Sequence, residues 1–469
     1  MENQNERLLQ FRRRDIEQVM GALRAGNSCA LIGVDGVGKS MLLKRFLTPT
    51  LREYYLPETY DHTFFFVLNS HELNNVSPLS YYRRMASLLK PLMHQYGLPI
   101  TGENALLIAD EDVASDVLFQ RVEALIQCDE RLLIAFFLDE FDIAYAKIEP
   151  QFMRVLKALR YRARGRVCYI IVSNNLPQLI CEARTRKLAR EAFEELFNRR
   201  VIGIKPLGQE DAFMLIDERL KGVALRGYAP SYTSLRRLLF EVTGGHHGLL
   251  KTALQALIDG EVQLQERETV ASLSEKLLDD ETIISKCEQL WNSLSESEQQ
   301  CLKHLQRGLL SKMLISQQFT NRQMHEVLYS LQIKGLLLES SRSKMYRCFA
   351  PLFGSFVMQQ ISSVAPGIQL DFARQQIWVD GILLPGRLTP SQVKLLRFLV
   401  AHAGEICPRQ DTTRAVYDEE YNADLDDARL DALVERTRKH IGDDSRAPRF
   451  LETVRGSGHR LNEYQGEHF

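Results

Sequence analysis

The segment formed by residues 33–40, GVDGVGKS, constrains the fold of this chain more than any other stretch. It matches the pattern G-x-x-x-x-G-K-[S/T], and its fixed positions are Gly33, Gly38, Lys39 and Ser40. Residues 28–32 before it form an apolar run of strand length, and residues 41–47 after it have the pattern of a helix. The motif requires this strand–loop–helix context, so the segment predicts a phosphate-binding loop in an α/β domain.

The chemistry of this loop indicates a nucleotide site. Its glycines let backbone N–H groups turn inward around phosphate oxygens, at a helix N-terminus whose dipole favours negative charge. Lys39 is expected to reach the β- and γ-phosphates, and the Ser40 hydroxyl is expected to ligate Mg²⁺. The expected ligands are therefore ATP or ADP with Mg²⁺. The expected contacts in this segment are Gly33, Val34, Asp35, Gly36, Val37, Gly38, Lys39, Ser40 and Met41.

A second motif follows about a hundred residues later, in residues 132–142, LLIAFFLDEFD. Its nearly uninterrupted apolar run indicates a strand buried on both faces of a parallel sheet. The run ends in Asp139 and Glu140, which at this distance from the phosphate loop form a Walker B pattern. Asp139 is expected to hold Mg²⁺ through water, and Glu140 to orient or deprotonate the attacking water. Asp142 is left open, with capping of the next helix as the simpler role.

The overall composition limits the remaining possibilities. A chain of 469 residues is too long for one ordinary domain, and about three are expected. The net charge of −1 argues neither for nor against a polyanionic partner. None of the eight cysteines are at C-x-x-C spacing, so neither a disulfide framework nor a zinc site is expected. Without a signal-peptide core or a membrane-length apolar run, we expect a cytoplasmic protein that makes no membrane contact.

Residues 243–250, TGGHHGLL, carry the first resemblance to a known family. They resemble the G-G-x-P segment in the lid of STAND-type ATPases, relatives of the AAA+ and origin-recognition proteins, with His247 in place of the usual proline. Together with the two motifs, the resemblance spans about residues 8–260. It implies a nucleotide-dependent switch in which lid groups contact the nucleotide. His246 is expected to meet a phosphate, and a helix-start turn with solvent-facing histidines is the alternative.

The same resemblance implies further site residues. Asn174, at the tip of the strand predicted after the Walker B strand, is chosen as the γ-phosphate sensor, without strong preference over its neighbours. Arg199 and Arg200 could sense phosphate charge, in cis or in a neighbour's site, or could form a surface pair. Arg14 lies where many ATPases carry an F-x-G-R-E entry that touches the adenine. That match is partial because Arg13 occupies the glycine position, and an ordinary amphipathic helix is the alternative.

The order of patterns predicts the domain organisation. Residues 1–206 are expected to form the P-loop domain and residues 207–278 a helical lid. In residues 279–360, helices precede the sequence KGLLLE and a short hairpin, a pattern typical of a winged helix. The resemblance makes this segment a regulatory arm rather than a second DNA reader. Residues 361–367 have the composition of a linker, and residues 368–469 follow as a separate module.

The C-terminal module carries the second resemblance. Its segments LTPSQVKLLRFLVAHAGEICPR, RLDALVERTRKHIG and TVRGSGHRL, in that order, resemble the OmpR/PhoB-type winged-helix DNA-binding domain of response regulators. The resemblance covers about residues 368–464 and departs at Gln392, where glutamate is usual, and at His459, where tyrosine is usual. The predicted fold class is therefore multidomain α/β, with a parallel-sheet P-loop ATPase and helical lid followed by two winged-helix (α+β) domains.

A helix predicted over residues 427–441 is the candidate DNA reader. Its apolar positions fall on one stripe and its cations mainly on the opposite face, as the major groove requires. The glycine-flanked hairpin after it resembles a wing that touches phosphates or the minor groove. The partner is expected to be double-stranded DNA, with a solvated helix as the alternative. The candidate DNA-binding residues are Arg429, Arg436, Arg438, Lys439, Arg455 and Arg460.

The charge of this module opposes strong binding by a single copy. From Pro366 to the end it has 14 Lys and Arg against 17 Asp and Glu, a net charge of −3. Binding is therefore expected to depend on pairing two half-sites. The acidic residues 418–427 lie where the resembled family has its polymerase-contacting turn, which makes RNA polymerase a candidate partner.

Two functional hypotheses follow. In the first, the chain is a signal-responsive transcription regulator: ADP holds a closed monomer, ATP and a stimulus promote a homo-oligomer, and slow hydrolysis resets it. In the second, it is an ATP-dependent machine on DNA, acting in transposition, replication loading or phage defence, and the winged helix only localises it. The sequence leaves open whether ATP is hydrolysed or only bound.

Overall fold

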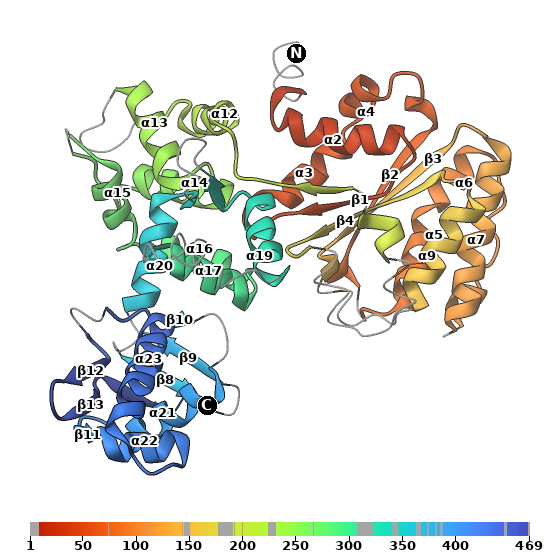
Figure 1. Cartoon of the computed structure of the whole chain (residues 1–469). Coiled ribbons are helices and arrows are strands. Elements are labelled where there is room, and N and C mark those ends of the chain that lie inside the picture. The colour runs from red at the N-terminus through yellow and green to blue at the C-terminus, as the bar shows by residue number, and fades with distance from the viewer. Residues whose placement is uncertain are drawn as a thin grey trace. The chain divides into compact units, whose positions relative to one another are not determined.

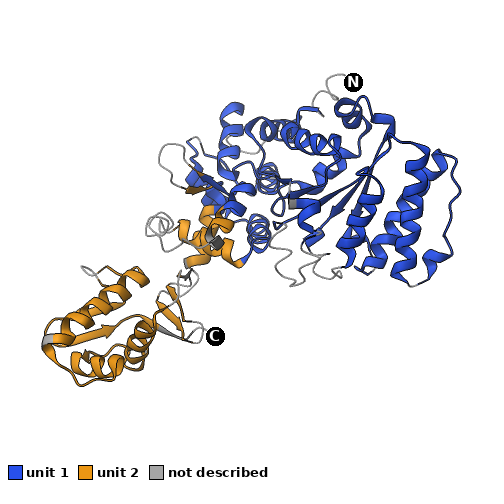
Figure 2. Ribbon diagram, turned by 45° about the vertical axis from the view of Figure 1, so that its right-hand side comes forward, with its two compact units in different colours: residues 1–295, 329–338, 349–353 blue, residues 296–328, 339–348, 354–469 orange. Residues whose placement is uncertain are grey.

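The structure is a computed structural model of the chain (Figure 1). It describes residues 9–73, 75–108, 110–142, 144, 151–176, 191, 193–198, 200–223, 231–265, 267–306, 322–339, 346–362, 367–372, 375–379, 382–384, 388–444 and 448–467. The chain divides into two compact units (Figure 2). Unit 1 comprises residues 1–295, 329–338 and 349–353, and unit 2 comprises residues 296–328, 339–348 and 354–469.

Unit 1 is built on a five-stranded sheet in which every neighbouring pair is parallel, in the order β2-β3-β4-β1-β5. The strands are β1 (Cys29–Ile32), β2 (Thr63–Asn69), β3 (Leu133–Asp139), β4 (Val167–Ser173) and β5 (Val201–Gly203). All residues of β1 and β4 are buried, as expected for strands covered on both faces. The parallel sheet of a P-loop domain is confirmed.

Successive side chains of a strand point to opposite faces of the sheet, so these apolar strands present apolar side chains on both faces. Helices cover both faces and bury these side chains. Phe136 of β3 belongs to a core shared with α5, α7 and α9, which Figure 1 shows beside one another. Its neighbour Phe137 stacks on Phe46 of α3, with ring centroids 5.3 Å apart. The helices of this part are α2 (Arg13–Arg24), α3 (Lys39–Phe46), α4 (Pro49–Tyr55), α5 (Pro78–Leu88), α6 (Lys90–Gln95), α7 (Glu111–Cys128) and α9 (Gln151–Arg162).

The segment after β5 is helical, as predicted for a lid. Its helices are α12 (Gln209–Leu220), α13 (Tyr232–Thr243), α14 (His247–Asp259), α15 (Val270–Leu277) and α16 (Glu281–Asn292). Four of them begin at a side chain that accepts a backbone N–H: Ser231, His246, Thr269 and Asp280. Such caps satisfy the amides that a helix N-terminus leaves without an intrahelical partner.

The expected second winged helix remains a prediction. This part contains α17 (Glu296–Gln306), α19 (Arg322–Ile333), β6 (Leu337–Glu339), β7 (Tyr346–Cys348) and α20 (Pro351–Ser362). Residues 307–321 and 340–345 of the predicted domain lie outside the described residues. The helix α20 continues to Ser362, so the first two residues of the predicted linker 361–367 are helical instead. An apolar turn of helix that buries Ile361 accounts for this difference.

Among its described residues, the C-terminal part of unit 2 contains two sheets and three helices around one core. The strands β8 (Ile368–Asp371), β9 (Gln376–Val379), β10 (Ile382–Leu383) and β14 (Tyr464–Glu467) form one sheet, in the order β10-β9-β8-β14. The strands β11 (Cys407–Pro408), β12 (Leu451–Val454) and β13 (Gly458–Leu461) form the other. The helices are α21 (Pro390–Ala401), α22 (Arg409–Tyr417) and α23 (Ala423–Ile441).

The start of α21 is fixed by its cap. The Thr389 side chain accepts the Gln392 N–H, and the Gln392 side chain accepts the Thr389 N–H, which completes a capping box. The core of this domain joins Leu395, Leu399 and Leu433 with wing residues such as Leu451. Within the described ranges of the whole chain, no helix has the length and apolar character needed to span a bilayer.

Candidate functional site

The phosphate loop runs from the end of β1 to the start of α3. Gly36 and Gly38 have φ angles of 73° and 103°, in the left-handed region that favours glycine. A Cβ atom at Gly36 would lie only 2.9 Å from Cε1 of His246, so close packing also requires glycine there. Gly38 is the N-cap of α3, which places the loop at a helix N-terminus.

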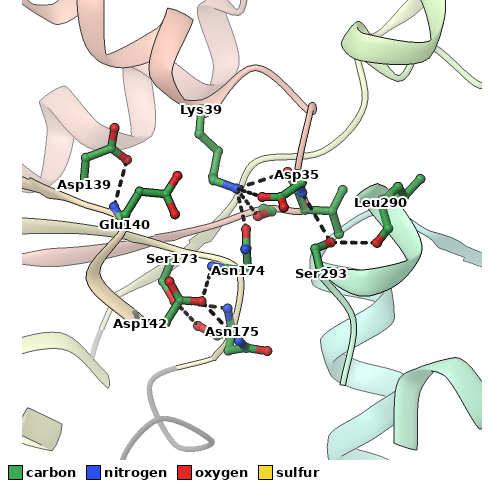
Figure 3. A network of polar contacts seen from close by, with 12 residues as sticks. Asp35, Lys39, Asp139, Glu140, Asp142, Ser173, Asn174, Asn175, Leu290 and Ser293 are labelled. Carbon is green, nitrogen blue, oxygen red and sulfur yellow. Dashed lines mark hydrogen bonds and ion pairs between the residues drawn. The ribbon is translucent and has the colours of Figure 1, made fainter. Parts of the chain in front are cut away.

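Lys39 is buried, and its ammonium group is fully engaged. Its Nζ donates to Gly33 O at 2.8 Å, to Val34 O at 3.2 Å and to Oδ1 of Asn174 at 2.5 Å (Figure 3). An ammonium has three donors, so these acceptors use all of them. The strand β4 carries Asn174 to the side chain expected to meet the phosphates, and the choice of Asn174 as the γ-phosphate sensor stays a prediction.

The carboxylates of the Walker B pattern lie at the end of β3. Asp139 is 3% exposed, and its Oδ1 accepts the Glu140 N–H at 3.0 Å. Glu140 has a φ of 55°, which is uncommon for a residue with a side chain and typical of strained functional turns. Burial raises the pKa of both carboxyls above their ordinary values, and the Lys39 ammonium lowers it by a smaller amount.

Asp142 has a role that the sequence left open. Its Oδ2 accepts the Asn174 N–H and the Asn175 Nδ2–H, each at 3.1 Å (Figure 3). Asp142 therefore ties the turn after β3 to the turn after β4. The sequence showed a third carboxylate two residues beyond Glu140. Its partners could not be predicted, because they depend on β3 lying beside β4 in the sheet.

Two lid helices bind the backbone of the phosphate loop directly. The Gly248 N–H, in the first turn of α14, donates to Gly36 O at 2.8 Å. His246, the N-cap of α14, donates from Nε2 to Asp35 O at 2.9 Å. The Asp35 N–H in turn donates to Oγ of Ser293, the C-cap of α16, at 3.4 Å (Figure 3).

His246 is therefore not a phosphate ligand, contrary to the expectation. Burial lowers its pKa to about 3, so the ring is neutral and offers one donor and one acceptor. Its Nε2–H binds Asp35 O, and its Nδ1 accepts the Leu249 N–H at 3.2 Å. Both ring nitrogens are used within the protein. The solvent-facing alternative is also wrong, because His246 is 1% exposed.

A cavity of 560 Å³ opens between the phosphate loop and the lid. It contacts the loop and Glu140 on one side and polar residues of α14 and α16 on the other. His247, Lys251 and Gln255 lie four residues apart along α14 and contribute one polar stripe. Lys251 and Lys286 were not predicted from the sequence, although the four-residue spacing after the glycine pair was a signal for Lys251. The residues of the loop that line the cavity are Asp35, Gly36, Gly38, Lys39, Ser40 and Met41.

Arg12, rather than Arg14, contacts the phosphate loop. Arg12 is 3% exposed, and its guanidinium donates to Val37 O and, at 3.1 Å, to Lys205 O. Arg14 is exposed on α2. Arg12 is the residue before α2, whereas Arg14 lies in the first turn of α2. Side chains two residues apart at a helix start point in different directions, so the Arg14 side chain points away from the loop.

The other two arginines predicted for this site are not seen in it. Arg199 lies outside the described residues. Arg200 immediately precedes β5, and its carbonyl accepts the N–H of Ala30 in the parallel strand β1 at 2.9 Å. The phosphate loop follows the opposite, carboxyl end of β1. Arg200 therefore cannot act in cis on the phosphates of this loop.

The DNA-reader helix predicted in the C-terminal domain is α23. Its buried residues include Leu430, Leu433, Val434 and Ile441, as predicted. Arg429, Arg436 and Lys439 are exposed on its other face, at spacings of seven and three residues. The turn of the β12–β13 hairpin carries the exposed Arg455 beside Gly456, whose φ is 76°. A basic helix face and a basic hairpin tip therefore occur in one small domain.

Arg438 was wrongly assigned to this surface. It is 7% exposed, its Nε donates to Leu451 O at 2.8 Å, and one terminal nitrogen donates to Thr453 Oγ1 at 2.7 Å. It joins α23 to the hairpin strand β12. Two other predicted cations have acidic partners, since Arg429 contacts Glu419 at 3.0 Å and Arg460 contacts Glu452 at 2.6 Å.

Comparison with known proteins identifies both parts. Residues 27–222 match the model of the NACHT domain, and residues 385–461 match the model described as "Transcriptional regulatory protein, C terminal". The chain joins a NACHT P-loop NTPase domain to an OmpR/PhoB-type DNA-binding domain. Both resemblances stated from the sequence are confirmed at the level of these domains.

Individual relatives match the C-terminal domain. The chain is 38% identical over 80 residues to protein PetR of Rhodobacter capsulatus, covering 16% of this chain and 34% of PetR. It is 39% identical over 77 residues to the transcriptional regulatory protein AfsQ1 of Streptomyces coelicolor, which covers 16% of this chain and 33% of AfsQ1. It is 36% identical over 114 residues to the transcriptional regulatory protein CusR of Escherichia coli, which covers 24% of this chain and 48% of CusR. The chain thus spans about a third to a half of the length of these relatives.

Solved structures give a likeness in fold alone. The Walker-type ATPase PABY2304 of Pyrococcus abyssi is 14% identical and aligns with 74% of this chain and 95% of its own, with a TM-score of 0.46. The DNA-binding domain of Klebsiella pneumoniae RstA, solved in complex with the RstA box, is 24% identical. It aligns with 20% of this chain and 89% of its own, with a TM-score of 0.18.

Proposed function

We propose that this protein is a DNA-binding transcriptional regulator that ATP and ADP switch between states, with slow ATP hydrolysis as the reset. The observation that carries the proposal is the direct bonding of the lid to the phosphate loop, through Gly248 N–H to Gly36 O and His246 Nε2–H to Asp35 O. A loop that changes shape around phosphates would change these bonds too. The lid therefore has a physical means of responding to the nucleotide.

The residues around the cavity fit a nucleotide with Mg²⁺. The backbone N–H groups of the loop and the Lys39 ammonium would hold phosphates, and Lys39 would exchange at least one of its present acceptors for a phosphate oxygen. Ser40 and Asp139 would hold Mg²⁺, which supplies neutralising charge at the β- and γ-phosphates. His247, Lys251 and Gln255 on α14 would contact the nucleotide from the lid side of the cavity.

Glu140 is the proposed general base. Its raised pKa brings the carboxyl closer to neutral pH, where a base accepts a proton from water more effectively. Asn174 is the proposed γ-phosphate sensor, because a γ-phosphate that takes Lys39 would release the Asn174 amide. Asp142 would pass this change to the turn that carries Glu140, since it binds the backbone and side chain of the neighbouring turn.

The DNA-binding domain would use α23 in the major groove and the β12–β13 hairpin as a wing. Arg436 and Lys439 would read or approach bases, and Arg455 would contact phosphates. The net charge of −3 on this domain makes a single copy a weak binder. We therefore propose that the ATP state forms a homo-oligomer, which binds two half-sites of double-stranded DNA together. The acidic residues 418–427 are the proposed contact with RNA polymerase.

The test compares DNA affinity in two nucleotide states. Full-length protein carrying Glu140→Gln should bind ATP without turning it over, because an amide can orient water but cannot take its proton. With ATP, this variant should bind a duplex selected from a random pool more tightly than the wild-type protein does with ADP. Light scattering should show a larger oligomer at the same concentration. Equal DNA affinity and equal mass in the two states would reject the switch, and strong DNA stimulation of wild-type turnover would favour the ATP-dependent machine.

A further inference from the structure

A second charged surface lies on the NACHT domain, and the nucleotide site does not use it. Residues 151–166 contain six Arg and Lys residues and no Asp or Glu, in a chain whose net charge is −1. Five of the six cations are arginines. The buried side of α9 consists of Phe152, Met153, Leu156 and Leu159, so the cations lie on its other sides. Such a concentration is unusual for one helix and the turn after it.

The exposed residues of α9 form a continuous stripe. Arg154, Lys157, Tyr161 and Arg162 recur at helical spacing and are all exposed. Tyr161 is 85% exposed, the largest value among the large apolar or aromatic side chains of the described residues. A hollow of 650 Å³ adjoins this stripe. It is lined by Lys157, Arg160, Tyr161, Arg162, Arg164 and Glu195, together with Gly165 and Leu196.

Further arginines continue this surface along one edge of the sheet. Arg166 immediately precedes β4, and Arg200 immediately precedes β5. Hydrogen bonds from Ile134 N to Arg166 O and from Ala30 N to Arg200 O fix both residues beside neighbouring strands. Because the strands are parallel, these residues lie at the amino-terminal edge, opposite the phosphate loop. We call the Arg and Lys residues of 154–166, together with Arg200, the cationic edge.

Acidic partners neutralise only part of this charge. Lys157 contacts Glu195, and Arg162 lies 3.7 Å from Glu123. Arg160 donates to Gly26 O at 2.7 Å, so its position is fixed by the backbone of the neighbouring turn. For Arg154 and Arg164, no ion pair occurs within the described part of the chain. Among the described residues, the cationic edge therefore keeps a net positive charge that these contacts do not neutralise.

We propose that the cationic edge binds the phosphate backbone of double-stranded DNA without regard to sequence. Guanidinium groups suit this ligand because their planar donors match phosphate oxygens in pairs. An exposed tyrosine among them can donate its hydroxyl to a phosphate. The proposal rests on the proposed function only in that the protein acts on DNA. The cationic edge would supply the sequence-independent attraction to DNA that the DNA-binding domain, with its net charge of −3, supplies poorly.

Two DNA contacts in one chain would also raise the effective concentration of the reader at its site. A weak reader domain then needs less intrinsic affinity, because the cationic edge retains the protein on the duplex. DNA is favoured over an acidic protein because the cations follow a helix and a sheet edge in an extended row, which suits a regular line of phosphates. Polyglutamate and anionic lipid vesicles serve as the competing ligands in the test.

The test uses the full-length chain with its reader weakened by Arg436→Ala and Arg455→Ala, so that binding through the cationic edge can be measured. Into this background we introduce Arg154→Gln, Lys157→Gln and Arg164→Gln together. Fluorescence anisotropy then follows binding to a labelled random-sequence duplex over a range of salt concentrations. Loss of three phosphate contacts should lower the slope of log affinity against log salt by about two to three units and weaken binding roughly 10- to 100-fold at low salt.

The matched control is Arg13→Gln, Arg84→Gln and Arg237→Gln in the same background. These exposed arginines lie on α2, α5 and α13, and their loss changes the net charge equally. The control should leave the salt slope unchanged, and unchanged ATP affinity would show that both triple variants are folded. The proposal is overturned if the two triple variants bind the duplex equally, or if the first loses only binding to polyglutamate or vesicles. Either result leaves the nucleotide switch, which the ATP and ADP comparison tests, unaffected.

Discussion

The Nζ atom of Lys39 lies 2.5 Å from Oδ1 of Asn174. The cation expected to bind phosphates is thus hydrogen bonded to the residue chosen as the γ-phosphate sensor. The two residues are 135 positions apart and meet because β1 and β4 are adjacent parallel strands. A phosphate bound to Lys39, as proposed, would compete with Asn174 for this ammonium group.

Replacing Lys39 tests the cradle directly. Lys39→Ala removes the cation expected to bind the β- and γ-phosphates, and charge-assisted bonds of this kind contribute about 1.5–3 kcal/mol each. We expect the affinity for ATP, measured by calorimetry, to fall by about 100-fold or more. The control is Lys44→Ala, an exposed lysine later on α3. If Lys39→Ala bound ATP with wild-type affinity, the loop would not be part of the nucleotide site.

Replacing Asn174 tests the competition. In Asn174→Ala, Lys39 loses one protein acceptor, so ATP affinity should stay within about fivefold of wild type or rise, since one neutral partner contributes about 1 kcal/mol. Turnover should fall and the difference in affinity between ATP and ADP should shrink, because the sensor is gone. Asn175→Ala is the matched control, since Asn175 contacts Asp142 but not Lys39. Equal discrimination between ATP and ADP in Asn174→Ala would show that Asn174 is not a sensor.

The sequence predicted the parts of this site that depend on local pattern. The loop, Asp139 and Glu140 are recognisable because fixed spacing follows from strand and helix geometry. The roles of Arg12, Asp142 and His246 depend on which strands and helices are neighbours, which local pattern does not encode. His246 shows the difference most clearly, because its glycine-rich context correctly predicted the start of a helix there. Its ring, however, binds the phosphate loop's own backbone rather than a phosphate.

A buried histidine makes the DNA-binding domain sensitive to acid. His459 of β13 is fully buried, and burial, the largest cause, lowers its pKa to about 4. Neither ring nitrogen has a hydrogen-bond partner among the described residues, and Nε2 lies 3.8 Å from Asp431. An unfolded histidine titrates near its ordinary value of 6.5. Between pH 6.5 and pH 4 the unfolded state therefore binds one more proton, and the free energy of unfolding falls as the pH falls.

This sign gives a prediction for His459→Phe. The wild-type domain should have its full stability above pH 6.5 and lose about 3 kcal/mol by pH 4 through this residue. The variant should lose correspondingly less over the same interval. Hydrogen exchange of the β12 and β13 amides in the full-length protein measures this local stability. Identical pH dependence in the two proteins would mean that His459 titrates normally in the folded state.

Two neighbouring arginines of α23 provide the sharpest test of the DNA interface. Arg436 is exposed, and its Nε contacts only Ala432 O at 3.1 Å among the described hydrogen bonds. Arg438 is buried and bonded to β12. Arg436→Ala should therefore cost about 1–3 kcal/mol on the best duplex and much less on random DNA, with no change in thermal stability. Arg438→Ala should instead destabilise the domain by about 1–3 kcal/mol, because it leaves buried acceptors without a donor.

Arg455→Ala completes the comparison, since base contacts carry discrimination and phosphate contacts mainly carry affinity. It should weaken binding to the selected and random duplexes about equally and lower the salt slope by roughly one unit. Gel-shift titrations have to be made at matched oligomeric state, because pairing of two domains contributes to the affinity of so acidic a module. If neither Arg436→Ala nor Arg455→Ala changes the shift while Arg438→Ala still destabilises the domain, the winged helix is folded as described but serves a protein partner instead of DNA.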